Sequence, residues 1–302
     1  MPTKKSKINE NKDNSIIARS DDGTVQITFT IPFSEIEEAR NKAAKELGRD
    51  LAVPGFRKGM APLSKVIESI PDNTLLEKCL SFILPDLVSK VIKENDLKPV
   101  IYPKFELVKA IDGEDWQIRA ITCELNPVEL SDYRKEISGS AKAKAIWTPK
   151  SGKPPEEPQD KVMTQHEKEH EVMEVLLKTT KVNIPKILVD EEVNSRLSKL
   201  LERIEKLGLN LESYLVSINK TAENLRSEYE IQSKETLALD LILTEIAKSE
   251  KVEVDKKDVD NAIKASQSDP QLAKELDTPE RRQFIEVILK RRKVLDNLIS
   301  LI

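Results

Sequence analysis

The sequence contains two stretches whose residue types and spacing could do chemistry, and the first is His166-Glu167-Lys168-Glu169-His170. It fits the pattern H-E-x-x-H, in which two imidazoles on one face of a helix bind zinc and the glutamate acts as a base. A third ligand could come from Asp190, Glu191 or Glu192. Residues 164–171 contain no apolar side chain, however, whereas a catalytic zinc helix is packed into a core that orients its ligands. We therefore interpret the stretch as a charged helix surface and predict no metal site at His166 and His170.

No other set of catalytic residues is found in the sequence. It has no glycine-rich phosphate-binding loop, no Cys-x-x-Cys pair, and no histidine outside the charged stretch that could activate a nucleophile. Cys79 and Cys123 are far apart and lie in apolar runs, so we expect buried free thiols of the kind found in a reducing cytosol. We predict that the chain is not an enzyme and uses no cofactor.

The second stretch is a loop over residues 53–62, with the sequence VPGFRKGMAP. Glycine allows positive φ, whereas proline fixes φ and favours the first turn of a helix, so the loop should end one helix sharply and start another. Its tip holds Phe56, Arg57 and Lys58 between two glycines. No acid occurs in residues 51–67, although the chain has a net charge of −4. The pattern favours a contact surface for a polyanion over an ordinary basic turn between helices.

This loop resembles the ribosome-docking signature of trigger factor, a bacterial chaperone, whose pattern is Gly-Phe-Arg-x-Gly-x-x-Pro. Every fixed position of the pattern is met in the sequence. The resemblance implies docking on the large ribosomal subunit at the exit of the peptide tunnel, with the cations meeting rRNA phosphate or acidic residues of a ribosomal protein. The ribosome-binding residues that it implies are Gly55, Phe56, Arg57, Lys58, Gly59 and Pro62.

Hydrophobic periodicity predicts the elements that position this loop. Two pairs of strands, over residues 15–20 with 25–31 and 104–111 with 116–125, each flank a turn containing Asp and Gly, which is typical of a hairpin. Three helices lie between the pairs, and Ser34 with Glu37 predicts a capping box at the start of the first. This order, which trigger factor's amino-terminal domain shares, predicts an α+β domain with an antiparallel sheet over residues 15–137. Residues 1–14 should form a disordered tail.

The chain changes character after residue 137. Residues 138–160 are rich in Ser, Gly, Ala, Lys and Pro, which is typical of a linker. Most trigger factors carry a prolyl isomerase domain of the FK506-binding type here, and this linker is too short to build one. From residue 161 to 302, apolar residues recur at spacings of three and four, which predicts an all-α, elongated carboxy-terminal domain. The run Ile184–Glu192 also resembles the opening of the trigger factor carboxy-terminal domain.

The composition limits the classes of function. Hydrophobic residues make up 38% of the chain, charged residues 34% and aromatic residues only 4%, which indicates a helix-rich, solvated architecture rather than one thick core. The slight net acidity argues against general nucleic-acid binding. No run approaches the roughly 18 uncharged residues of a membrane helix, and residues 1–14 do not resemble a signal peptide. We therefore expect a cytoplasmic protein with no membrane partner.

These features predict a ribosome-associated, ATP-independent chaperone that resembles trigger factor without its isomerase domain. The helical domain would shield unfolded or nascent polypeptides, although periodicity alone does not separate open helical arms from a closed bundle. Two other classes stay open. One is an enzyme, either a prolyl isomerase with residual activity or the zinc hydrolase above, and the other is a ribosome-binding adaptor without chaperone activity. Client preference and oligomeric state are open as well, a weak homodimer included.

Overall fold

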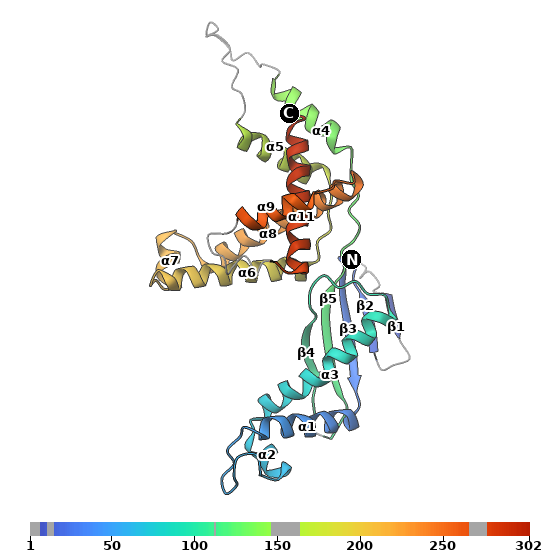
Figure 1. The fold of residues 1–302 in the computed structure, drawn as a ribbon, viewed down its shortest axis with the longest axis vertical. Coiled ribbons are helices and arrows are strands. Elements are labelled where there is room, and N and C mark those ends of the chain that lie inside the picture. The colour runs from blue at the N-terminus through green and yellow to red at the C-terminus, as the bar shows by residue number, and fades with distance from the viewer. Residues whose placement is uncertain (1–6, 11–14, 112, 146–163, 266–276) are drawn as a thin grey trace, which may run out of the picture. The chain divides into compact units, whose positions relative to one another are not determined.

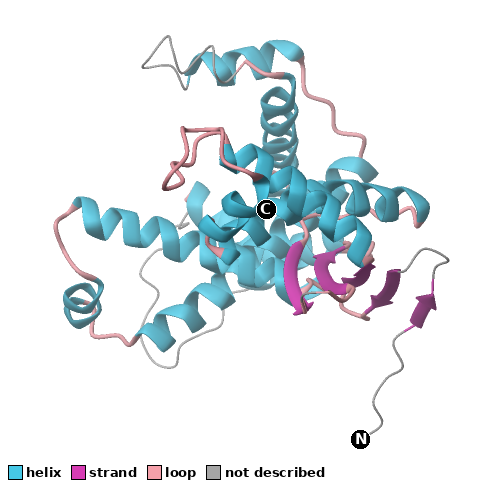
Figure 2. Cartoon of the chain, turned by 90° about the horizontal axis from the view of Figure 1, so that it is seen from below, coloured by secondary structure: helices cyan, strands magenta, loops and turns pink. Residues whose placement is uncertain are grey.

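The structure, a computed structural model, describes residues 7–10, 15–111, 113–145, 164–265 and 277–302. The chain forms two compact units, unit 1 over residues 1–125 with Pro185–Leu188 and unit 2 over residues 126–184 with 189–302. The strands of the described chain all belong to unit 1, whereas unit 2 is helical (Figure 2). This arrangement confirms the predicted order of an α+β region followed by a helical region. Among the described helices, none combines the length and apolar character needed to cross a bilayer.

Unit 1 is built on a five-stranded antiparallel sheet with the order β1-β2-β3-β5-β4 (Figure 1). Its strands are β1 (Lys7–Glu10), β2 (Ser15–Arg19), β3 (Thr24–Ile31), β4 (Lys104–Lys109) and β5 (Trp116–Cys123). Every second residue of β3 is buried, as the sequence predicted for a strand with one face on a core. These residues are Val25, Ile27, Phe29 and Ile31.

Three helices connect β3 to β4, namely α1 (Phe33–Gly48), α2 (Leu63–Ser69) and α3 (Asp72–Glu94). Residues such as Ile27 of the sheet and Val88 of α3 share one apolar core. A second cluster joins the end of α1 to α2 and to the start of α3, and it also contains Val53. Because Val53 lies between α1 and α2, this cluster ties the intervening loop to the helices on both sides.

Unit 2 is a set of helices, some of which share one apolar core. The helices are α4 (Tyr133–Ala145), α5 (Gln165–Thr179), α6 (Lys186–Lys206), α7 (Leu211–Ser217), α8 (Ala222–Ser249), α9 (Lys256–Ala265) and α11 (Pro279–Ile299). Ile137, Leu176, Ile246 and Leu298, from α4, α5, α8 and α11, are all buried in this core. The core therefore joins the beginning and the end of unit 2.

A polar cluster fastens the start of α4 to the end of α8. The hydroxyl of Tyr133 donates to Oε1 of Glu250 at 2.7 Å, and the guanidinium of Arg134 donates to the same oxygen at 2.7 and 3.1 Å. Burial alone would raise the pKa of the Glu250 carboxyl, but the hydrogen bonds from Tyr133 and Arg134 outweigh burial and lower it. The carboxylate is thus held in its charged form at neutral pH.

The observed boundaries differ from the predicted ones in three places. Lys7–Glu10 form β1 because they pair with β2, although the sequence analysis assigned them to a disordered tail. The units divide after Leu125 rather than after residue 137, because Tyr133 and Ile137 pack into the core of unit 2. Helix α4 continues to Ala145, so the first part of the predicted linker is helical. The rest of that linker, up to residue 160, lies outside the described residues.

The predicted capping box at Ser34 and Glu37 is wrong. Helix α1 begins at Phe33, and its N-cap residue is Pro32. The start of the helix therefore has no hydrogen bond from a capping side chain. The N–H of Phe33 instead donates to Oδ1 of Asp115 at 2.9 Å. A residue of the second hairpin therefore satisfies this helix end, which local sequence cannot reveal.

Candidate functional site

Two tight turns shape the loop over residues 53–62. They span Val53–Phe56 and Arg57–Met60, and each is closed by a hydrogen bond from its last N–H to its first carbonyl, at 3.1 and 2.9 Å. The third residue of each turn is a glycine with positive φ, +84° at Gly55 and +76° at Gly59. Such a φ is required at this position of a type II turn, and an L-residue adopts it only at a cost. The sequence therefore fixes the backbone of the loop before any partner binds.

Close packing holds both ends of the loop. Val53 is buried before the first turn, and Ala61 and Leu63 pack on the same apolar cluster after the second. At the end of α1, a Cβ on Gly48 would lie 2.8 Å from Cγ1 of Val66 in α2. The two helices thus approach more closely than a side chain at residue 48 would permit, and the loop projects from a rigid base.

The tip of the loop is exposed and basic. Phe56 is 44% exposed and the neighbouring Met60 is 74% exposed. Arg57 forms no ion pair within the described chain, whereas Nζ of Lys58 lies 3.1 Å from Oδ1 of Asp50. Both partners of this pair are exposed, so it contributes little stability and can exchange for another anion. The structure brings the predicted tip residues together on one exposed surface with their framing residues Gly55, Gly59 and Pro62.

A second exposed surface lies in unit 2, on an arm that we define as residues 197–231. It comprises the end of α6, all of α7 and the start of α8, with α7 at its end (Figure 1). Only Ile204 and Leu225 are buried within this range. Six aliphatic side chains are exposed on the arm, between 37% and 80%: Leu201, Leu207, Leu209, Leu211, Val216 and Ile231. An arm with so little buried surface is open rather than part of a closed bundle.

Sequence reasoning did not single out this group of aliphatic residues. Spacing by three and four predicts helices here, but it does not tell exposed apolar residues from buried ones such as Ile204. The signal that was available is the interruption around Gly208 and Asn210, which end α6 and cap α7. Apolar residues on both sides of such a helix break cannot all share one buried face.

The histidine stretch lies in the first turns of α5. His166 and His170 are exposed, and the carboxylate of Glu167 accepts hydrogen bonds from the N–H and the hydroxyl of Thr164, at 2.8 and 3.0 Å. Glu167 is thus part of a capping box and is not oriented as a base. In the part of the chain that the structure describes, no three His, Cys, Asp or Glu side chains form a metal-binding group. Residues 164–171 are not an exposed charged surface throughout, since Glu171 is buried.

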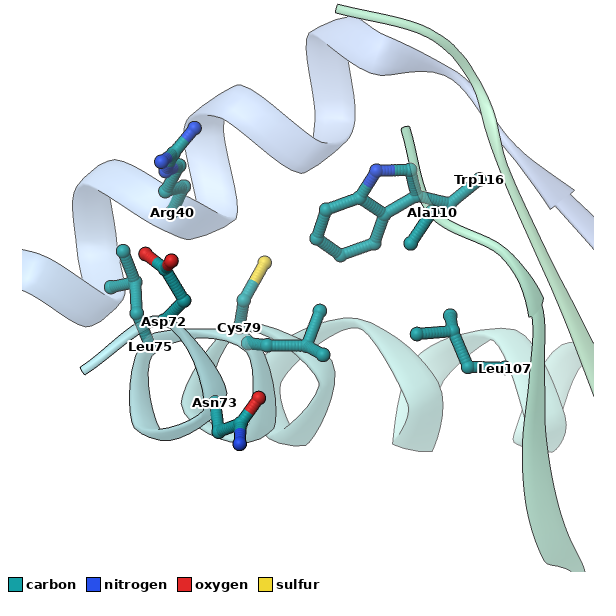
Figure 3. Close-up of a pocket in the computed structure, with 9 residues that line it drawn as sticks. Arg40, Asp72, Asn73, Leu75, Cys79, Leu107, Ala110 and Trp116 are labelled. Carbon is teal, nitrogen blue, oxygen red and sulfur yellow. The ribbon is translucent and has the colours of Figure 1, made fainter. Parts of the chain in front are cut away.

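Unit 1 also contains a cavity of about 380 Å³ between α1, the start of α3 and the hairpin of β4 and β5 (Figure 3). Trp116 and Leu107 line it on the strand side, and Arg40 and Asp72 lie at the opposite end. Among its described lining residues, Cys79 carries the one thiol and none carries a hydroxyl. The Cys79 thiol donates to the carbonyl of Ile36 at 3.7 Å, and burial raises its pKa.

Both cysteines are free and buried, as predicted. Burial, and to a smaller extent the charge of Asp22, raises the pKa of Cys123 to about 11. The thiolate is the reactive form of cysteine, so neither thiol is activated for catalysis. The cavity beside Cys79 therefore carries no catalytic set.

Two family models match the chain in succession. The model of the bacterial trigger factor protein matches residues 15–146, and that of the trigger factor carboxy-terminus matches residues 157–300. Only residues 147–156 separate the two matches, which leaves no region for an isomerase domain between them.

Curated relatives and a solved structure agree with these matches. Trigger factors of Clostridium botulinum and Clostridium acetobutylicum are 31% and 33% identical over 126 and 121 residues, which is 40% of this chain and 29% and 28% of those proteins. The trigger factor of Streptococcus agalactiae is 35% identical over 108 residues, or 36% of this chain and 25% of that protein. The chain thus matches less than a third of the length of these relatives.

The solved structure comes from a study of "Promiscuous Substrate Recognition in Folding and Assembly Activities of the Trigger Factor Chaperone". It covers 93% of this chain and 98% of its own, with a TM-score of 0.56 and 14% identity. This likeness extends to both units, and it is a likeness of fold.

Proposed function

Because this chain belongs to the trigger factor family, we propose that it docks on the large ribosomal subunit at the exit of the peptide tunnel through the loop over residues 53–62. The observation that carries this proposal is the exposed tip of Phe56, Arg57 and Lys58, held by two glycine turns. The two cations would bind rRNA phosphates or carboxylates of a ribosomal protein. Phe56 would add an apolar contact beside them.

Co-sedimentation of the full chain with ribosomes tests the proposal. The triple variant Phe56→Ala, Arg57→Ala, Lys58→Ala should lose at least about tenfold in affinity. Its thermal unfolding should hardly change, because exposed side chains contribute little to stability. A control variant removes one aromatic and two cations from exposed positions elsewhere in unit 1, by Tyr102→Ala, Lys93→Ala and Lys98→Ala, and should bind normally. Full binding by the loop variant would disprove this docking mode.

We further propose that unit 2 holds unfolded polypeptides, called clients below, as an ATP-independent chaperone in the cytoplasm. The arm supports this role because it exposes six aliphatic side chains and buries two residues. Exposed apolar residues concentrated on one part of a protein are typical of interaction sites, and an aliphatic surface without a fixed pocket suits varied partners. The sequence has no phosphate-binding loop that would couple holding to ATP.

Suppression of aggregation of a denatured protein tests this second role. Replacing Leu207, Leu209 and Val216 by Ser should reduce protection about threefold or more, because each exposed aliphatic adds apolar contact area. The control replaces three equally aliphatic exposed residues of unit 1, Val100, Val108 and Ile111, by Ser and should protect normally. Addition of ATP should change nothing. If the wild-type chain binds ribosomes and gives no protection, the adaptor function replaces the chaperone function.

We propose that the chain does not accelerate prolyl isomerisation. The uncatalysed barrier is ~18–20 kcal/mol, and lowering it needs a preorganised pocket that excludes water. No isomerase region separates the two family matches. A proline-limited refolding reaction should therefore run at the same rate with the native chain as with a denatured-protein control, and a clear acceleration would contradict the proposal.

A further inference from the structure

We propose that a groove between α8 and α11 binds client segments in which acidic residues neighbour aliphatic or aromatic ones. This inference rests on the proposed chaperone function and names the chemistry of a client for a site distinct from the arm. The groove has a volume of about 420 Å³ and lies where the end of α8 meets the middle of α11. That volume is within the range of sites that enclose several side chains or a small ligand.

The apolar part of the groove is formed by the way α8 ends. The N–H of Val252 donates to the carbonyl of Ala247 at 2.9 Å, and the N–H of Lys251 donates to that of Lys248 at 3.2 Å. These two bonds form a Schellman motif, which turns the chain back over the last helical turn. Val252 and Ala247 consequently line the groove together, with Val287 of α11 as the third apolar residue.

The apolar surface continues along α11 beyond the groove. Phe284, Val287 and Ile288 are 66%, 37% and 44% exposed. Because residues three and four apart are neighbours on a helix, these three side chains form one continuous stripe that leads into the groove at Val287. An apolar client segment can therefore contact the stripe and the groove at once.

Positive charge surrounds this apolar surface. Lys248, Lys251, Lys290 and Arg291 line the groove, and Glu253 is the one carboxylate among its described lining residues. The long aliphatic stems of lysine and arginine can cover an apolar side chain while their charged ends stay in water. A client with carboxylates beside its apolar residues complements this surface, whereas a basic client is repelled by it.

The cations differ in how firmly they are held. Arg291 is fixed, since it lies 3.0 Å from Asp240 and donates to the hydroxyl of Thr244 at 2.8 Å. Lys290 pairs with Glu286 of its own helix at 2.7 Å and is 32% exposed. Within the described chain, Lys248 pairs with Glu245 of its own helix at 3.2 Å and is 69% exposed. Exposed pairs of this type are weak, so Lys248 can turn to a client carboxylate at small cost.

Lys251 is the cation best placed to bind a client carboxylate. It forms no ion pair within the described chain and follows the last turn of α8, next to the apolar Val252. Its backbone has a φ of +50°, a conformation that glycine adopts more easily than lysine. Replacement of Lys251 by glycine therefore removes the ammonium group and relaxes the backbone, which separates binding from folding.

Labelled peptides that differ only in charge test the inference with the full chain. The probe is a short unstructured peptide that contains Leu and Phe next to two Glu residues, compared with versions carrying Gln or Lys in place of Glu. Fluorescence anisotropy at moderate salt should show roughly fivefold tighter binding of the Glu peptide than of the Gln peptide, since two exposed charge contacts are gained. The Lys peptide should bind most weakly. Equal or tighter binding of the Lys peptide would overturn the inference.

Variants assign this preference to the groove. Lys251→Gly should abolish most of the difference between the Glu and Gln peptides, with a thermal midpoint equal to or above that of the unchanged chain. The charge control is Lys234→Ala, at an exposed residue inside α8, where glycine would weaken the helix. This variant should keep the difference between the Glu and Gln peptides. Val287→Ser should weaken the Glu and Gln peptides alike. An undiminished preference in Lys251→Gly would disprove the role of the groove.

The outcome for the groove is separable from the outcome for the chaperone function. If the chain suppresses aggregation and shows no preference for acidic peptides, the groove inference fails alone. If it neither suppresses aggregation nor binds any of the peptides, the chaperone function fails. If Val287→Ser changes the sedimentation coefficient of the chain and leaves peptide binding intact, the groove is a contact between two copies, and the inference is wrong.

Discussion

The loop over residues 53–62 and the arm over residues 197–231 expose apolar side chains in opposite ways. The loop presents Phe56 on a backbone that two glycine turns and the buried Val53 hold in place. The arm spreads six exposed aliphatic side chains over three helices and the connection between α6 and α7, with two buried residues. A contact that depends on a few fixed groups is sensitive to single substitutions, whereas a dispersed one is tolerant. The two surfaces should therefore respond differently to the same kind of change.

The largest difference is expected from placing a glutamate at one residue of each surface. Arg57→Glu should lower ribosome affinity about tenfold, because it removes a cation and adds a repulsive charge next to the bound anion. Leu207→Glu should reduce aggregation suppression less than about twofold, since the other exposed aliphatic residues of the arm remain. Co-sedimentation and light scattering measure the two effects. A tenfold loss in the arm variant would mean that the arm, too, acts through a single point.

A smaller effect should follow from changing the loop backbone without changing its tip. Gly55→Ala places a Cβ on a residue with a φ of +84°, and nothing lies within 4 Å of that Cβ, so the effect is conformational and not steric. An L-residue in this region costs roughly 1–2 kcal/mol, which should reduce ribosome affinity about fivefold as the loop leaves its turn. Gly139→Ala, which also adds a Cβ to open space but at a helical residue of α4, is the control and should bind normally. Unchanged binding by Gly55→Ala would show that the loop is shaped by its partner.

The fold of unit 1 and the shape of its loop could be predicted because local sequence determines them. Alternation along β3 predicted its buried face, and the glycines at residues 55 and 59 predicted the turns that the structure shows. The start of α1 could not be predicted, because the N–H of Phe33 donates to Asp115, a residue 82 positions away in the chain. Such long-range partners are chosen by the tertiary fold and leave no signal in the neighbouring sequence.

In unit 2, the local sequence predicts the helices but not which of their apolar residues are buried. Helical periodicity located its helices, but the same periodicity occurs in the buried α8 segment around Ile246 and in the exposed arm around Leu207. Burial depends on which helices lie opposite, and α4, α5 and α11 cover the end of α8. The groove at Lys251 was likewise hidden, because it joins residues of two helices that are separated in the sequence.

Added salt should weaken docking by the loop but not client holding by the arm, with a smaller effect than the substitutions above. If two cations of the loop contact single-stranded rRNA phosphates, a doubling of monovalent salt should weaken docking about two- to threefold, from a slope of roughly −0.7 per contact. Client holding by the aliphatic arm should stay constant or rise slightly, because apolar contacts are not screened. Parallel titrations of co-sedimentation and aggregation suppression measure both responses. Equal salt dependence would contradict the assignment of charge to the loop and apolar contact to the arm.

The smallest effect concerns Asp50, the acid that forms an ion pair with the tip of the loop in the described part of the chain. Its Oδ1 lies 3.1 Å from Nζ of Lys58, so it competes with the ribosome for that cation. Since exposed ion pairs are weak, Asp50→Asn should raise ribosome affinity, by less than about twofold, and leave client holding unchanged. The control is Asp86→Asn, at an exposed residue of α3, which should bind as the unchanged chain does. A decrease in affinity for Asp50→Asn would mean that the ion pair orients Lys58 for docking, which would make Asp50 a positioning residue of the loop and extend the fixed geometry of the loop to its side chains.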